Sequence, residues 1–129
     1  MKVFIADGSK FGLRRILALL NDIKHFELVG YSADVFGAVV SIRATKPEVV
    51  ILDLEMRGDT GIRVLKTIKE ELPSITFIIV TNFSSDQYRN RCKELGAEFF
   101  FDKSAEFQKI PETIKHLAEG LPLNSLSKN

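Results

Sequence analysis

Residues 49–53 of the chain read Val-Val-Ile-Leu-Asp, a short apolar run that stops at a carboxylate. The run has no polar alternation and is rich in β-branched residues, which is typical of a strand covered on both faces in a parallel sheet. Similar short apolar runs lie at residues 3–6, 26–29, 77–80 and 99–101. A buried helix segment is the alternative interpretation of each run, because periodicity alone does not separate the two. Their length favours strands.

The segments between these runs have apolar residues at helical spacing. The sets are Leu13, Ile16, Leu17 and Leu20; Val35, Val39 and Ile42; Leu65, Ile68 and Leu72; Tyr88, Cys92 and Leu95; and Ile110, Ile114 and Leu117. Ser84 with Gln87 could form a capping box, and Gly96 and Gly120 follow helical segments as C-terminal caps. Regular alternation of strand and helix implies parallel strands joined by right-handed crossovers. We therefore predict an α/β fold with a doubly wound, five-stranded parallel sheet.

Length and charge exclude several classes of protein. The 129 residues fit one compact domain, and 18 Lys and Arg against 17 Asp and Glu leave a net charge of +1. This balance argues against direct electrostatic binding of nucleic acid. The longest apolar run, residues 16–20, is far shorter than the roughly 20 residues of a membrane-spanning helix. With Cys92 as its single cysteine, the chain has no internal disulfide, and we expect a cytoplasmic protein without membrane contact.

Polar residues stand at the carboxyl ends of four predicted strands: Asp7, Asp53, Thr81 and Lys103. Ligands of open parallel sheets bind outside these ends, so the four side chains are expected at one rim. Each alone has an ordinary explanation, because Asp and Thr are common in turns and caps and a single Lys is usually solvated. Their joint occurrence favours a binding site.

This set of residues suits phosphoryl transfer. Two neighbouring carboxylates need a cation, and ligation by oxygen alone favours a hard ion such as Mg²⁺. Asp53 could act as a nucleophile and form an acyl phosphate. Thr81 would then donate a hydrogen bond to the phosphoryl oxygens, and Lys103 would supply positive charge.

Four segments that contain these residues, 3–7, 49–56, 79–81 and 96–103, together resemble the receiver domain of bacterial response regulators, the phosphoacceptor part of two-component signalling. The resemblance covers residues 2 to about 119, and it implies a flavodoxin-like (βα)5 fold with strand order 2-1-3-4-5. A stand-alone receiver domain over residues 1–121 is expected, followed by a short tail at residues 122–129.

The resemblance also implies roles for individual residues. Asp53 would be the phosphoacceptor, and Thr81 and Lys103 would contact the phosphoryl group. The Mg²⁺ ligands would be Asp7, Asp53 and the backbone carbonyl of Glu55. Thr81 and Phe100 would be the switch residues.

The implied partners are a histidine kinase or histidine phosphotransfer protein as donor and an unknown downstream protein as target. No enzymatic activity is expected beyond self-phosphorylation from a phosphodonor and autodephosphorylation.

Three residues depart from the family pattern. Gly8 follows Asp7 where the family has a second acid, so Mg²⁺ must keep another water or recruit Asp7, Ser9 or Glu55, and its affinity should fall. The Glu55 side chain could substitute for the missing acid or be a solvated acid at the rim. Asn82 stands where the family favours a small residue and Arg57 where it often has Pro, and either could slow access to Asp53.

Three alternative functions are weighed against a phosphoacceptor. Gly8 is the main observation in favour of a degenerate receiver that acts as a phosphorylation-independent interaction module. An aspartate-nucleophile phosphohydrolase could use Asp53 and Glu55, but such enzymes generally carry this motif on an early strand of a longer chain. A flavin-binding domain is disfavoured because Asp7 and Asp53 would repel a phosphate group that arrives without a metal.

Overall fold

The computed structural model describes residues 1–121, in which five strands and five helices alternate. The tail predicted at residues 122–129 lies outside the described residues. The elements are β1 (Lys2–Ala6), α1 (Lys10–Leu20), β2 (Glu27–Ser32), α2 (Val35–Thr45), β3 (Val49–Leu52), α3 (Gly61–Glu71), β4 (Thr76–Thr81), α4 (Asp86–Glu94), β5 (Phe99–Asp102) and α5 (Lys109–Ala118). Over residues 1–121, no helix combines the length and apolar character needed to cross a membrane.

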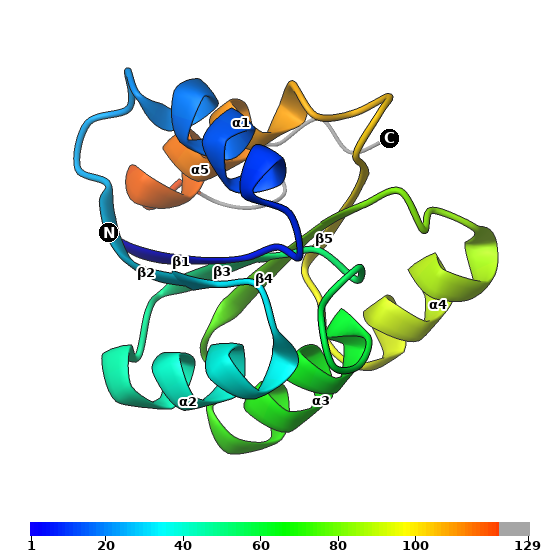
Figure 1. Ribbon diagram of the computed structural model, residues 1–129. Coiled ribbons are helices and arrows are strands. Elements are labelled where there is room, and N and C mark those ends of the chain that lie inside the picture. Colours follow the sequence, from blue (N-terminus) through cyan, green and yellow to red (C-terminus); the bar gives the residue numbers. More distant parts are fainter. Residues whose placement is uncertain (122–129) are drawn as a thin grey trace.

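All strand pairs are parallel, and the order in the sheet is β2-β1-β3-β4-β5. Helices α1 and α5 cover one face, and α2, α3 and α4 cover the other (Figure 1). The predicted doubly wound α/β fold and its strand order are therefore confirmed. The chain leaves β1 in one direction to form β2 and returns on the other side of β1 to form β3, so the order reverses between β1 and β3. Ligand sites of such sheets lie at this reversal.

The strands β1, β3 and β4 form the centre of the core. Their side chains alternate between two apolar clusters: Phe4 and Val50 face the side of α2 and α3, whereas Val3 and Ile51 face the side of α1 and α5. Because both faces are covered by helices, neither set of positions can be polar. This double burial explains the apolar runs in the sequence.

Strand β2 is longer than predicted. It extends to Ser32 instead of ending at residue 29, and its register with β1 shifts opposite Val3 and Phe4. As an edge strand it is partly exposed, so its sequence includes Gly30 and polar residues that weaken the apolar pattern.

The predicted caps are partly confirmed. Gly96 and Gly120 have positive φ angles of 100° and 68°, as expected for residues that end helices. The prediction of Ser84 as the N-cap of α4 is wrong: Ser85 is the cap, and its hydroxyl accepts a hydrogen bond from the backbone N–H of Tyr88. Ser84 instead donates its hydroxyl hydrogen to the carboxylate of Asp102.

Candidate phosphoacceptor site

The four predicted residues lie at the same rim of the sheet. Asp7, Asp53, Thr81 and Lys103 are all buried, with at most 8% of any residue exposed. Backbone hydrogen bonds extend the sheet into the loops: the N–H of Asp53 donates to the carbonyl of Ala6 (2.8 Å), and the N–H of Lys103 donates to the carbonyl of Thr81 (2.9 Å). The sheet itself therefore positions the side chains.

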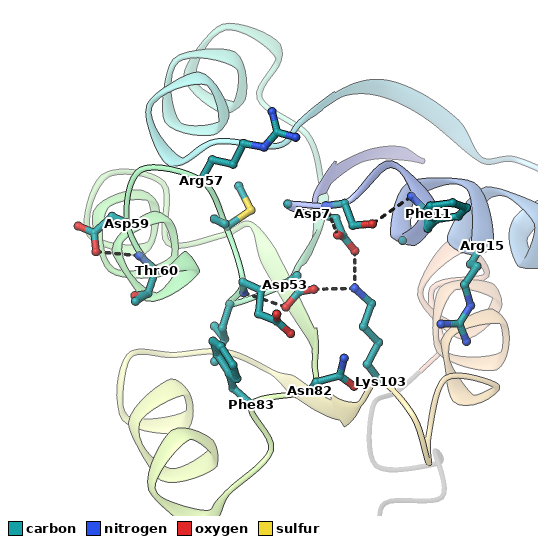
Figure 2. A pocket seen from close by; sticks show the side chains of 16 residues that line it. Asp7, Phe11, Arg15, Asp53, Arg57, Asp59, Thr60, Asn82, Phe83 and Lys103 are labelled. Carbon is teal, nitrogen blue, oxygen red and sulfur yellow. Dashed lines mark hydrogen bonds and ion pairs between the residues drawn. The ribbon is translucent and has the colours of Figure 1, made fainter.

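An ion triad forms the centre of this rim (Figure 2). The Nζ atom of Lys103 lies 2.6 Å from Oδ2 of Asp53 and 2.9 Å from Oδ2 of Asp7. The second oxygen of each carboxylate accepts a backbone N–H: Ser9 donates to Asp7 Oδ1 (2.8 Å), and Glu55 donates to Asp53 Oδ1 (2.9 Å). Both carboxylates are thereby held in fixed orientations.

Burial and charge act against each other in the triad. Burial raises the pKa of Asp7 above 3.8, although the hydrogen bond and the charge of Lys103 lower it. For Lys103, burial alone would lower the pKa, but the hydrogen bonds and charges of Asp53 and Asp7 outweigh burial and raise it above 10.5. With the three groups ionised the triad carries one net negative charge, so it attracts a further cation.

The other predicted residues lie around the triad. Thr81 is fully buried, and its Oγ1 accepts a hydrogen bond from the backbone N–H of Phe83 at 3.1 Å. Phe100 is half-buried on β5, and the guanidinium carbon of Arg89 lies 4.7 Å from its ring centroid. The carbonyl of Glu55 accepts a hydrogen bond from the N–H of Gly8 (3.0 Å), which brings the loop after β1 against the loop after β3.

Two glycines allow this close packing. A Cβ atom at Gly8 would overlap the carbonyl oxygen of Glu55 and would lie 3.3 Å from Cα of Met56. A Cβ atom at Gly12 would overlap the carboxylate of Asp7, because the first turn of α1 packs directly on that group. The sequence indicated Gly8 as a missing acid, but neither of these close approaches could be predicted from it. Gly8 allows two loops to pack together, and Gly12 allows α1 to pack on Asp7.

A cavity of about 610 Å³ opens above the triad. Asp7, Asp53 and Lys103 line its floor, and Phe11 and Phe83 stand at its sides (Figure 2). Phe11 is 76% exposed and Phe83 is 39% exposed. The floor of the cavity is therefore charged, whereas its sides carry exposed aromatic rings.

The donors at the rim fit a hard cation. They are the carboxylates of Asp7 and Asp53 and the backbone carbonyl of Glu55, an oxygen set of the kind that Mg²⁺ prefers. Among residues 1–121, no group of three or more His, Cys, Asp or Glu side chains is arranged for metal binding. With only two carboxylates, a bound ion would keep several waters.

Comparison with known proteins identifies the family. The profile of the response regulator receiver domain matches residues 3–115, which is most of the chain. The chain belongs to the response regulator receiver family. The resemblance inferred from the sequence is thus confirmed.

Known relatives and structures support this membership. The receiver chain is 31% identical over 116 residues to the uncharacterized transcriptional regulatory protein YhcZ of Bacillus subtilis, covering 88% of this chain and 53% of that protein. It is 30% identical over 126 residues to protein-glutamate methylesterase/protein-glutamine glutaminase 3 of Geobacter sulfurreducens, covering 94% of this chain and 34% of that protein. The isolated receiver domain of RcsB from Salmonella enterica serovar Typhimurium, solved with the phosphomimetic BeF3⁻, superimposes with a TM-score of 0.85 at 27% identity, covering 95% of this chain and 91% of that one.

Receiver domains of response regulators are phosphoacceptor switching domains and are generally not enzymes themselves. The receiver chain spans about half or less of the length of these two curated relatives. The methylesterase activity in one relative's name therefore does not transfer to this chain. The family match also removes the phosphohydrolase and flavin-binding interpretations, and it adds nothing to Gly8 in favour of a degenerate receiver.

The triad predicts opposite effects of two substitutions on stability. Lys103→Met leaves two buried carboxylates without a cation, and we expect it to lower the free energy of unfolding by about 3–5 kcal/mol at pH 7. Asp53→Asn leaves Lys103 paired one-to-one with Asp7, so this variant should be at least as stable as the parent. Urea denaturation without Mg²⁺ measures both.

The pH dependence provides a check on this prediction. The hydrogen bond and charge of Lys103 lower the pKa of Asp7, so in Lys103→Met this pKa should be higher than in the parent. The variant should then take up a proton at a higher pH than the parent, and its loss of unfolding free energy relative to the parent should shrink as the pH falls from 7 towards 4. A deficit that stays constant over this range would contradict the charge-based explanation.

Proposed function

We propose that Asp53 accepts a phosphoryl group from a histidine kinase or a histidine phosphotransfer protein. In this step an oxygen of Asp53 bonds to phosphorus, the bond between phosphorus and the donor imidazole breaks, and the imidazole nitrogen regains a proton. The observation that carries the proposal is the 2.6 Å contact between Lys103 Nζ and Asp53 Oδ2. It puts a buried cation beside the carboxylate that would receive the added negative charge.

The residues Asp7, Asp53 and the carbonyl of Glu55 would hold Mg²⁺. When bound, this ion would offset the negative charge of the carboxylates and of the phosphoryl oxygens. Lys103 now bonds to both carboxylates, so we infer that it gives up at least one of these contacts and turns towards the phosphoryl group. Gly8 supplies no ligand, which predicts weak binding of the metal.

Thr81 and Phe100 would pass the change to the surface formed by α4, β5 and α5. The Thr81 hydroxyl would exchange its present contact with the Phe83 N–H for a hydrogen bond to the phosphoryl group. Because Phe83 lies in the loop that connects β4 to α4, this exchange would move a segment that Arg89 links to Phe100 through the carbonyls of Ser84 and Phe100. An unidentified downstream protein would recognise the altered surface.

Other parts of the proposal concern activity and partners. Self-phosphorylation from small phosphodonors and autodephosphorylation are the two reactions that the chain would support without a partner. The exposed side chains of Phe11 and Phe83 at the cavity favour a protein as phosphodonor, and no direct nucleic-acid contact is proposed. A domain boundary at residue 121 and a cytoplasmic location stay predictions.

Covalent labelling tests the phosphoacceptor. We expect the parent protein, incubated with acetyl phosphate and Mg²⁺, to gain the mass of one phosphoryl group, and Asp53→Asn to gain none because the amide is a poor nucleophile. Intact-protein mass spectrometry measures the label. Stable labelling of Asp53→Asn would overturn the assignment, and an unlabelled parent would favour the degenerate interaction module.

Substitutions at Gly8 separate the steric effect of a side chain at this position from the effect of its charge. Gly8→Ala forces a Cβ atom against Glu55 and should cost about 1–3 kcal/mol of stability, with or without Mg²⁺. Gly8→Asp meets the same overlap and adds a third carboxylate, so it should be the less stable of the two variants without metal. Mg²⁺ should restore stability to Gly8→Asp alone and bind more tightly to it than to the parent.

Thermal denaturation across a Mg²⁺ titration distinguishes these outcomes. Equal recovery of Gly8→Ala and Gly8→Asp, or no recovery of either, would contradict a role of position 8 in metal affinity.

A further inference from the structure

Arg89 joins three segments near the switch residues. Its guanidinium group lies over the ring of Phe100, with Cζ 4.7 Å from the ring centroid. The same group donates from Nη1 to the carbonyl of Phe100 (3.4 Å) and from Nε to the carbonyl of Ser84 (3.3 Å). One side chain on α4 therefore contacts both the ring and the backbone of Phe100, and also the loop between β4 and α4.

Glu106 holds Arg89 in this position. Arg89 Nη2 donates to Glu106 Oε1 at 3.0 Å, and the same oxygen accepts the backbone N–H of Asp102 at 2.9 Å. Lys109 Nζ lies 2.9 Å from the other oxygen, Oε2. Although burial acts to raise it, the pKa of Glu106 is lowered to about 2 by these hydrogen bonds and by the charge of Lys109. The ion pair with Arg89 is therefore intact at neutral pH.

The same cluster reaches the phosphoacceptor site. The hydroxyl of Ser84 donates to the carboxylate of Asp102, which also accepts the backbone N–H groups of Ser104 and Ala105. Asp102 and Ser104 flank Lys103 in the chain, so the cluster ends one residue away from the ion triad on either side.

Helix α4 has few apolar contacts that could position it instead. Cys92 is its only buried residue, and the other positions of the helix are mostly polar or charged. A helix with so narrow an apolar face is weakly held by packing. The contacts of Arg89 with Phe100 therefore add a polar link between α4 and β5 to the apolar packing of Cys92 and Tyr88.

We propose that Arg89 is a positioning residue for the switch, which holds Phe100 and the loop between β4 and α4 in the unphosphorylated arrangement. Its link to signalling rests on the proposed function, since a movement of Thr81 would pull the loop that carries the Ser84 carbonyl away from Arg89. An arginine is needed because only its planar fork reaches the Ser84 carbonyl, the Phe100 carbonyl and the Glu106 carboxylate together.

The first arm of the test uses the unphosphorylated protein. Arg89→Met keeps the aliphatic part of the side chain and removes the fork, Arg89→Lys keeps the charge without the fork, and Arg91→Met is the matched control. Arg91 lies on the same helix but is exposed and pairs only loosely with Glu94, at 3.6 Å. NMR spectra of each variant give the chemical shifts of the backbone amides of Ser84, Phe100 and Asp102 and of the Phe100 ring.

We expect Arg89→Met and Arg89→Lys to shift these resonances and to speed hydrogen exchange at the Asp102 amide by about fivefold or more, whereas Arg91→Met should leave them unchanged. If Arg89→Met does not fold, the same measurement is made on Arg89→Lys and Glu106→Gln. Spectra of the Arg89 variants that match the parent at these positions would overturn the proposal. Equal shifts of these resonances in Arg91→Met would also overturn the proposal.

The second arm separates this proposal from the proposed function. The rate of labelling by acetyl phosphate and Mg²⁺ should rise about fivefold in Arg89→Met, because the unphosphorylated arrangement loses its restraint. Shifted resonances with a parental labelling rate would overturn the link between Arg89 and switching. If the parent is not labelled at all, the proposed function fails, and the first arm still decides whether Arg89 positions Phe100.

Discussion

The contact of one buried ammonium group with two buried carboxylates is the interaction on which the site depends. Lys103 reaches from the end of β5 past β4 to Asp53 after β3 and Asp7 after β1, so the triad joins chain segments from both halves of the domain. Without the lysine, two like charges would share a buried space, which is strongly unfavourable. With it, one negative charge remains, and this residual charge makes the rim receptive to a metal ion.

The glycines at the rim belong to the same arrangement. Gly8 lets the loop after β1 contact Glu55, and Gly12 lets the first turn of α1 pack on the carboxylate of Asp7. Gly8 therefore has two consequences, since it removes an oxygen ligand and also brings two loops together. An acidic residue at position 8 could not be accommodated without moving one of these loops.

The sequence predicted the parts of the structure that depend on local patterns. The apolar runs at residues 49–52 and 77–80 identified central strands, because strands covered on both faces have no room for polar residues. The ends of these runs located Asp53 and Thr81 at one rim. The edge strand β2 was predicted less well, because a partly exposed strand with an irregular register has no such pattern.

Features that depend on contacts between distant segments were not predictable in this way. The N-cap at Ser85 was missed because the neighbouring Ser84 has the same chemistry, and only the contact with Asp102 shows that Ser84 has another partner. The overlap that a side chain at Gly8 would create, and the position of Arg89 over Phe100, likewise follow from the packing of loops and helices. No spacing in the sequence indicates them.

An NMR titration of the Lys103 ammonium group in the metal-free protein tests directly whether this lysine bridges the two carboxylates. We predict a pKa above the ordinary 10.5, because the hydrogen bonds and charges of Asp53 and Asp7 outweigh burial, and a lower pKa in Asp53→Asn, where one partner is lost. A Lys103 pKa at or below 10.5 in the parent protein, unchanged by Asp53→Asn, would show that the lysine does not bridge the two carboxylates.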